Sequence, residues 1–301
     1  MKTSKFLLAV ALIIIISLAA LIWFFPPNGD FRVDNPSWNG LSTLDSRMKA
    51  TVIDSFSALP SDPNGTALLL VPFEPFSASE LSDLKSYALN GGTLIVLDNF
   101  GYGNQVLSGV GLSMTFSGVP MLDPMFNYKN EWFPKITDFA SIPLTANISS
   151  LVLNHATCLN NTSGATIVAF SSSFSFLDIK GSGTWVSSDP IGPFAYAAYV
   201  KIGQGYVVAM ADPSIMINSM IGMGGNLQFI DNIVKLSGPN PHVFIDQGHL
   251  QTVPLDTAKA DLAVAYSAFS SPFLTLTLIA VIIVLSLNSV WRKGERRAEK
   301  G

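Results

Sequence analysis

Two uninterrupted apolar stretches, one near each end of the chain, stand out in the pattern of hydrophobic and polar positions. They cover residues 6–25 and 273–291, and neither contains a charged side chain. At about 1.5 Å of rise per residue, each forms a helix long enough to cross the roughly 30 Å hydrocarbon core of a bilayer. The pattern therefore predicts transmembrane helices over 6–25 and 272–291.

The basic residues that flank these stretches predict the orientation of the chain. Lys2 and Lys5 lie in the tail 1–5, and the tail 292–301 holds a further group of Lys and Arg residues. Short cationic segments next to a transmembrane helix stay in the cytoplasm. Both tails are therefore expected to be cytoplasmic, and the region between the two helices is expected to be extracytoplasmic.

A cleaved secretory signal is the alternative interpretation of the first stretch. Its apolar run is longer than the roughly 7–15 residues of a signal core, and Phe24-Phe25-Pro26-Pro27 contains no small-residue cleavage pattern. The sequence therefore favours an uncleaved membrane anchor.

The region 26–254 has the pattern of an α/β domain. Thr66–Phe73 and Thr93–Leu97 are short, continuously apolar runs, which are typical of strands covered on both faces. Between them, Ser77–Glu80 is a helix-start signature, and Asn90-Gly91-Gly92 ends the amphipathic segment that follows. A strand, a helix and a strand in this order predict a βαβ unit of a parallel sheet flanked by helices.

Other segments fit the same architecture. Strands are predicted over 165–170, 195–202, 206–211 and 242–245, and helices over 41–59, 226–236 and 255–271. Gly203-Gln204-Gly205 is a tight link that predicts an antiparallel pair of strands. Residues 112–160 show no clear periodicity and are interpreted as an insertion or cover. The helix over 255–271 is interpreted as a stalk that leads into the second transmembrane helix.

Charge and cysteine content narrow the classes of function. Residues 26–272 hold 19 Asp and Glu against 10 Lys and Arg, a net charge of −9, which gives little attraction for nucleic acid. Cys158 is the single cysteine, which excludes a disulfide within the chain and a cysteine-rich metal site. No motif for a cofactor is found. Sequons that predict candidate glycosylation sites in an exported domain begin at Asn64, Asn147, Asn160 and Asn161.

Three polar clusters follow predicted strands. They are Asp98, Asn99 and Asn104; Asp212, Ser214 and Asn218; and Asp246, Gln247 and His249. In an open parallel sheet, ligands bind outside the carboxyl ends of the strands, so these clusters predict one ligand-binding cleft. Gly101 and Gly103 would let backbone N–H groups approach a ligand, and the carboxylates would hold a cation, a sugar hydroxyl or a basic peptide.

Other interpretations of these residues stay open. Asp and Asn at strand ends also cap helices and close turns without any ligand. Asp98, Asp212 and Asp246 together would suit a hard cation, which needs several oxygen ligands. His155 and Cys158 would suit a thiol nucleophile with its base, but their spacing in a strand would point them to opposite faces. We expect a binding cleft without catalytic residues or a metal.

Several motifs carry a family resemblance. Asn90–Asp98 with Phe100–Asn104, Gly203–Ser214 with Asn218, and Val243–His249 resemble the DUF4350 family of membrane-anchored prokaryotic proteins, whose function is unassigned. The resemblance implies a class I glutamine-amidotransferase-like, flavodoxin-like domain and an archaeal source. The turn after Asp98 contains no Cys or Ser, so the resemblance does not extend to the nucleophile of catalytic amidotransferases.

These observations together predict a membrane-anchored, extracytoplasmic ligand- or protein-binding module without catalytic activity, working as a subunit of a membrane complex with other membrane or extracytoplasmic proteins. A hydrolase that acts on a sugar or peptide through the strand-end carboxylates is the alternative, and it requires those carboxylates to meet around one pocket. An accessory subunit of an exporter is a third interpretation, which requires partners because the spans carry no charge.

Overall fold

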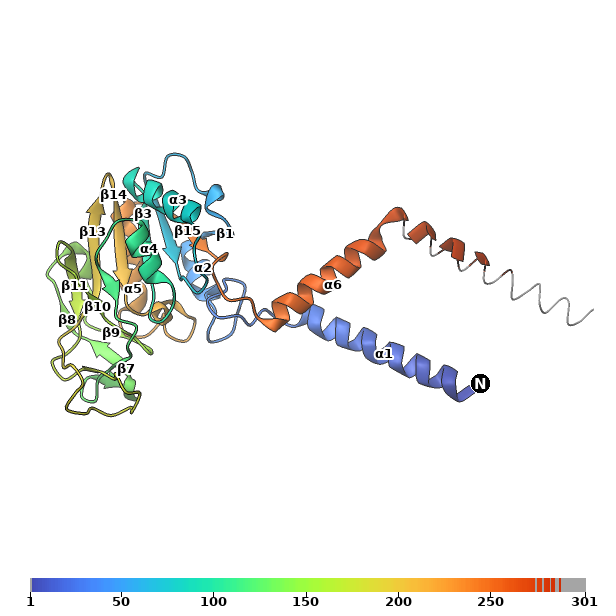
Figure 1. Ribbon diagram of the computed structural model, residues 1–301, viewed down its shortest axis with the longest axis horizontal. Coiled ribbons are helices and arrows are strands. Elements are labelled where there is room, and N and C mark those ends of the chain that lie inside the picture. The colour runs from blue at the N-terminus through green and yellow to red at the C-terminus, as the bar shows by residue number, and fades with distance from the viewer. Residues whose placement is uncertain (1, 274, 278, 282, 285–286, 288–301) are drawn as a thin grey trace, which may run out of the picture. The chain divides into compact units, whose positions relative to one another are not determined.

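The structure is a computed structural model that describes residues 2–273, 275–277, 279–281, 283–284 and 287 (Figure 1). The chain divides into two compact units. The terminal unit comprises residues 1–25 and 252–301, and the central unit comprises Pro26–Gln251. The sheet and the candidate site both belong to the central unit.

Within the described residues, a ten-stranded mixed sheet forms the middle of the central unit. Its main path runs in the order β1, β15, β2, β3, β14, β13, β10, β4, and β11 and β8 extend it from β13. Strands β1, β15, β2, β3 and β14 are parallel to one another. The strands are β1 Thr51–Ile53, β2 Thr66–Leu70, β3 Thr93–Leu97, β4 Thr115–Phe116, β8 Asp138–Phe139, β10 Leu159–Asn160, β11 Thr166–Phe170, β13 Ala195–Ile202, β14 Gly205–Met210 and β15 His242–Asp246.

Helices flank this sheet, which confirms the prediction of a mainly parallel α/β architecture. They are α2 Ser42–Met48, α3 Ala78–Leu89, α4 Gly103–Gly109 and α5 Asn226–Val234, with short 3-10 helices at η1 Phe56–Ala58, η2 Pro143–Thr145, η3 Pro213–Met216 and η4 Lys235–Ser237. The predicted helix over 226–236 corresponds to α5, which buries Phe229, Ile230 and Ile233.

The βαβ unit formed by β2, α3 and β3 follows from local sequence. Every residue of β2 and β3 is buried, as expected for strands covered on both faces. Helix α3 begins with a capping box in which Ser77 Oγ accepts a hydrogen bond from Glu80 N and the Glu80 carboxylate accepts one from Ser77 N. The helix buries Leu84, Tyr87 and Ala88.

The link between β13 and β14 is also as predicted. Ile202 is paired with Gly205 in an antiparallel ladder, and Gly203 has a positive φ of 56°. A Cβ atom at Gly203 would lie 2.5 Å from the carbonyl oxygen of Leu89. The glycine is therefore required both by the turn and by the close approach of α3.

The predicted helix over 41–59 is wrong. Helix α2 ends after Met48 because Lys49 adopts the left-handed conformation, with φ 51°. Residues Thr51–Ile53 then form β1, which pairs in parallel with residues 244–246 of β15. The apolar residues of this segment have helical spacing, but Thr51, Val52 and Ile53 are β-branched and favour a strand. Hydrogen bonds to β15 satisfy their backbone N–H and C=O groups, so the segment forms a strand and not a helix.

The position of β15 is a second difference from the sequence interpretation. In chain order the five parallel strands are β1, β2, β3, β14 and β15, but β15 lies between β1 and β2. This order departs from the 2-1-3-4-5 order of flavodoxin. The coarse α/β architecture is therefore the predicted one, whereas the strand order is not that of flavodoxin.

Residues 112–160, which lack periodicity in the sequence, form short strands, of which β4, β8 and β10 belong to the main sheet. Outside the main sheet, β5 Met121–Leu122 pairs with β12 Phe176–Leu177, and β7 Asn130–Ile136 pairs with β6 Asn127–Tyr128 and β9 Leu151–Val152. These pairings are too short for a period to be visible in the sequence. They bring residues near 154 to the edge of the sheet that holds Asp212, whose Oδ2 accepts a hydrogen bond from Asn154 N.

The terminal unit contains one described helix that is long and apolar enough to cross a membrane. Helix α1 covers Lys2–Phe24, and its segment Phe6–Phe24 has a mean hydropathy of 3.0. By length and composition alone, this segment fits either a transmembrane span or a signal sequence. Helix α6, Pro254–Ser270, occupies the predicted stalk. Residues 274, 278, 282, 285–286 and 288–301 lie outside the described residues, so the second span and the basic tail stay predictions.

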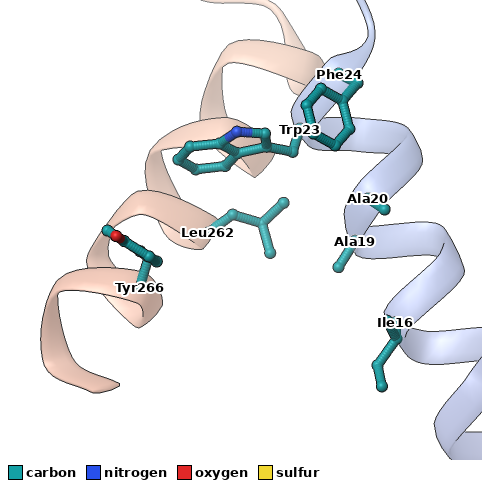
Figure 2. A pocket seen from close by; sticks show the side chains of 7 residues that line it. All are labelled: Ile16, Ala19, Ala20, Trp23, Phe24, Leu262 and Tyr266. Carbon is teal, nitrogen blue, oxygen red and sulfur yellow. The ribbon is translucent and has the colours of Figure 1, made fainter. Parts of the chain in front are cut away.

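A groove of about 540 Å³ lies between the two helices of the terminal unit (Figure 2). Trp23 extends from α1 toward α6, where its ring lies 6.2 Å from that of Tyr266. Lys259 Nζ donates a hydrogen bond of 2.6 Å to the carbonyl oxygen of Phe25, which follows α1. The other lining side chains are aliphatic or aromatic, namely Ile16, Ala19, Ala20, Phe24 and Leu262. The groove therefore offers apolar packing and little polar chemistry.

Candidate functional site

The three predicted polar clusters lie at one edge of the central sheet. Strands β15, β2, β3 and β14 are parallel neighbours, so their carboxyl ends meet at that edge. β15 ends at Asp246, Asp98 directly follows β3, and Asp212 lies two residues after β14. This is the edge at which open α/β sheets bind ligands.

The Asp98 carboxylate binds its own loop. Its Oδ1 accepts a hydrogen bond from Gly101 N and its Oδ2 accepts one from Gly103 N, both at 2.7 Å. The side chain is buried, and burial raises the pKa of Asp98 while these N–H groups lower it. A Cβ atom added at Gly103 would lie 2.5 Å from Asp98 Oδ2, and one added at Gly101 would lie 2.3 Å from the carbonyl oxygen of Pro72. The two glycines therefore serve the closure of this loop, which differs from the predicted approach to a ligand.

Asn104 and Asn99 also form hydrogen bonds within the fold. Asn104 Oδ1 accepts from Phe116 N at 2.7 Å and Nδ2 donates to Phe116 O at 3.0 Å, which ties α4 to β4. Asn99 Oδ1 accepts from Phe100 N at 2.9 Å, and Nδ2 donates to the carbonyl oxygen of His155 at 3.2 Å. Asn99 thus links the end of β3 to the segment 112–160, which is called the insertion from here on.

Asp212 is fully buried and links β14 to the insertion. Its Oδ1 accepts from Ser214 N at 2.7 Å, and its Oδ2 accepts from Asn154 N at 2.8 Å. Burial raises the pKa of Asp212 to about 7, although these hydrogen bonds lower it. Burial, with the charge of Asp212, also raises the pKa of Tyr196, whose hydroxyl has no hydrogen-bond partner among the described residues.

Asn218 and Gln247 hold the loop 28–41, which lies near the start of the central unit. Asn218 Oδ1 accepts from Thr43 N at 2.8 Å, and its Nδ2 donates to the carbonyl oxygens of Asn35 and Ser37 at 3.1 and 2.6 Å. Gln247 forms two hydrogen bonds of 3.1 Å with the backbone of the same loop. These two side chains therefore position the loop 28–41 against the edge of the sheet.

His249 lies between two carboxylates and two aromatic rings. Its Nδ1 lies 2.9 Å from Asp246 Oδ2, and its Nε2 lies 3.5 Å from Glu80 Oε1. Its ring stacks on Phe56 at 5.0 Å and on Phe76 at 4.1 Å. Burial lowers the pKa of His249, but the hydrogen bond to Asp246 and the two negative charges outweigh it, so the pKa is raised. The imidazole is thus held inside the fold.

A cleft of about 350 Å³ lies at the same edge of the sheet. It is formed by the loop 28–41, by the segments that follow β2, β3 and β14, and by the insertion. Its lining residues are Asp30, Phe31, Trp38, Asn39, Phe73, Asn99, Phe100, Asn154, His155, Ser214 and Ile217. Of the predicted site residues, Asn99 and Ser214 line this cleft, whereas Asp98, Asp212, Asp246 and His249 are not among its lining.

His155 contacts three neighbouring side chains at the cleft. Its backbone has a positive φ of 55°, which is unusual for a residue with a side chain. Its Nδ1 lies 2.6 Å from Asn154 Oδ1, and its ring stacks on Trp132 at 5.0 Å and meets Phe133 edge-on at 6.2 Å. Burial lowers the pKa of His155, which favours the neutral ring at pH 7. The imidazole is therefore held by its neighbours and is mostly neutral at pH 7.

Exposed aromatic rings border the cleft. Trp38 is 66% exposed and Phe100 is 49% exposed, although both are large apolar residues. Trp38 lies in the turn-rich segment 34–40, whose backbone is held by Asn218. Aromatic faces beside polar groups are typical of sites that bind a small polar ligand.

Other candidate residues have structural positions. Cys158 is buried, and burial raises the pKa of its thiol to about 11, which agrees with an unreactive cysteine. Among the described residues, no group of three or more His, Cys, Asp and Glu side chains is arranged to hold a metal ion. The four sequon asparagines, Asn64, Asn147, Asn160 and Asn161, are all exposed.

The sequence interpretation did not single out Trp38, Asn154 or His155 as a site. These residues come from two segments that lie far apart in the chain. A partial signal was present: Trp38 is an aromatic residue inside a turn of Asn, Pro, Ser and Gly. The sequence pattern connects His155 only with Cys158, as its base.

Comparison with known proteins identifies a family. A model of a domain of unknown function, DUF4350, matches residues 33–234. No curated protein matches the chain.

Solved structures with a similar chain path include the N-terminal domain of mmIFT52, with 17% identity, a TM-score of 0.46, and coverage of 58% of this chain and 79% of that chain. A cytoplasmic protein from Salmonella typhimurium LT2 has 13% identity and a TM-score of 0.39, with 60% and 74% covered. A β-galactosidase from Bacillus circulans sp. alkalophilus has 10% identity and a TM-score of 0.34, and the match covers 58% of this chain but 23% of that enzyme.

Proposed function

The chain belongs to the DUF4350 family, a domain of unknown function, and we propose that its central unit is a non-catalytic ligand-binding module. The observation that carries this proposal is the cleft of about 350 Å³ with Trp38, Phe100, Asn154 and His155 in its lining. Its volume falls in the range of small-molecule sites, about 300–1,000 Å³.

The positions of the three strand-end carboxylates argue against a hydrolase that uses them. Asp98 and Asp212 each accept two backbone N–H groups, and Asp246 binds His249. None of the three is among the lining of the cleft. A hydrolase that uses these carboxylates would need at least one of them within reach of a bound substrate.

We further propose that α1 anchors this module in a membrane, with the central unit on the extracytoplasmic side and the chain acting as a subunit of a membrane complex. The apolar segment Phe6–Phe24 and the basic residues Lys2 and Lys5 before it support this topology. Cysteine labelling tests it. Ser187→Cys places a thiol at an exposed position, and a membrane-impermeant maleimide should label it in intact cells, whereas buried Cys158 stays unlabelled. Labelling only after lysis would contradict the topology.

Ligand binding is tested on the full chain in mild detergent with a thermal-shift screen of sugars, amino acids, short peptides and nucleotides. A ligand of the cleft should raise the Tm of the wild type and leave the Tm of the Trp38→Ala variant unchanged. Trp185→Ala is the matched control, because Trp185 is 50% exposed and is not among the lining of the cleft. The proposal fails if no compound shifts the Tm, if both Trp variants respond like the wild type, or if a bound compound is turned over.

A further inference from the structure

The charge of the cleft restricts the chemical class of its ligand. Asp30 is the one lining residue with a charged side chain among those described, and no Lys or Arg lines the cleft. The neutral ring of His155 adds no positive charge. Sites for anions typically contain Arg, Lys or clustered N–H donors. In this cleft a phosphate, sulfate or carboxylate group on a ligand would instead meet the negative charge of Asp30, with no Lys or Arg in the lining to offset it. The cleft therefore disfavours nucleotides and other anionic ligands.

The polar groups of the cleft match hydroxyl groups. Asn154 Oδ1 can only accept a hydrogen bond, so His155 Nδ1 carries the proton of the neutral ring and Nε2 keeps a lone pair. The Asn154 amide NH₂ forms no hydrogen bond within the described residues, and Asp30 binds Asn39 Nδ2 through one carboxylate oxygen. The cleft thus combines acceptors with a donor, and a hydroxyl group can serve both kinds of partner at once.

The aromatic rings provide the apolar part of such a site. Trp38, Phe100, Phe73 and Phe31 line the cleft beside these polar groups. The face of an aromatic ring carries partial negative charge, and the C–H groups on the face of a sugar ring carry partial positive charge. A pyranose has both an apolar C–H face and a rim of hydroxyl groups, which is the combination that the lining complements.

We propose that the cleft binds a neutral carbohydrate of one or two sugar rings, stacked on Trp38 and hydrogen-bonded to Asp30, Asn154 and His155. This inference rests on the proposed function, since it names the ligand class of the same cleft. The cleft volume of about 350 Å³ is near the lower end of the range for ligand sites, which suits a monosaccharide or disaccharide and not a long chain.

Saturation-transfer NMR on the full chain in nanodiscs tests the ligand class. The probes are glucose, galactose, mannose, N-acetylglucosamine, maltose and cellobiose, together with glucose 6-phosphate and glucuronate as anionic counterparts. We expect at least one neutral sugar to receive saturation at its ring C–H protons, and glucose 6-phosphate and glucuronate to bind at least tenfold more weakly than that sugar.

Variants of the lining complete the test. Trp38→Ala and His155→Ala should each weaken binding of that sugar at least tenfold, Trp38→Phe should restore part of the affinity, and Trp185→Ala should leave the Kd within twofold. Trp38 is exposed, so its replacement leaves the core intact, and the thermal melt of each variant checks this. The sugar proposal is overturned if no neutral sugar binds, or if binding is independent of Trp38. If an amino acid or peptide binds in a Trp38-dependent manner instead, the ligand class is wrong while the proposed function stands.

Discussion

Replacement of Asp98 separates a structural carboxylate from a ligand-binding one. Its two oxygens accept hydrogen bonds from Gly101 N and Gly103 N, and these bonds close the loop between β3 and α4. In Asp98→Ala both N–H groups lose their acceptor. Gly103 is buried, so water cannot replace the carboxylate at that position.

The magnitude follows from these two bonds. A hydrogen bond to a charged acceptor contributes about 1.5–3 kcal/mol net. Burial raises the pKa of Asp98, which means that burial of the charge opposes part of this gain. We therefore expect Asp98→Ala to lower the free energy of unfolding by about 3 kcal/mol. Asp98→Asn retains a single acceptor oxygen and turns an amide NH₂ toward the other donor, so its cost is about 2 kcal/mol.

The measurement is urea unfolding of the full chain in mild detergent at pH 7, followed by Trp fluorescence of the central unit. The change should appear in the midpoint and not in the m-value, because the surface exposed on unfolding is the same. Asp83→Ala is the matched control. Asp83 is exposed on α3, so its replacement should change stability by less than about 0.5 kcal/mol.

Ligand affinity, measured without urea at a temperature where each variant is folded, decides between a structural and a ligand-binding role of Asp98. A ligand whose binding depends on Trp38 should bind Asp98→Ala with nearly unchanged affinity. The structural role of Asp98 would be refuted if Asp98→Ala unfolded at the wild-type urea concentration and lost the ligand.

Three further predictions concern buried groups near the same edge. Asp212 keeps its proton in the folded chain up to about pH 7, whereas the unfolded chain releases it near pH 4, so the free energy of unfolding should decrease as the pH rises from 4 to 7. In Asp212→Asn the urea midpoint should depend less on pH over this range, and a pH dependence equal to that of the wild type would contradict the raised pKa. Gly103→Ala should lower stability by about 1–3 kcal/mol in the same unfolding assay, because the added Cβ would lie 2.5 Å from Asp98 Oδ2, and wild-type stability would show that the loop relaxes freely. Cys158 should resist iodoacetamide in the folded chain and react after unfolding, as read by mass spectrometry, since burial raises its pKa to about 11; rapid alkylation of the folded chain would contradict its burial.

Local patterns in the sequence were sufficient for several elements. The apolar segment of α1 needs no partner to be recognised, because its length and hydropathy are properties of the segment itself. The capping box at Ser77, the buried strands on either side of α3 and the Gly203 turn also depend on neighbours within a few residues. For the same reason the sequence placed Asp98, Asp212 and Asp246 correctly at strand ends.

Only the tertiary structure decided what those strand ends do. Residues 51–53 form a strand because β15, about 190 residues later in the chain, supplies the backbone partners that a helix would otherwise provide. The carboxylates of Asp98 and Asp212 each accept two hydrogen bonds from backbone N–H groups, so they hold loops together and do not line the cleft. The cleft brings together Trp38, Phe100 and His155 from three separate segments. A local sequence pattern cannot show that these residues are close, because only the pairing of distant segments places them side by side.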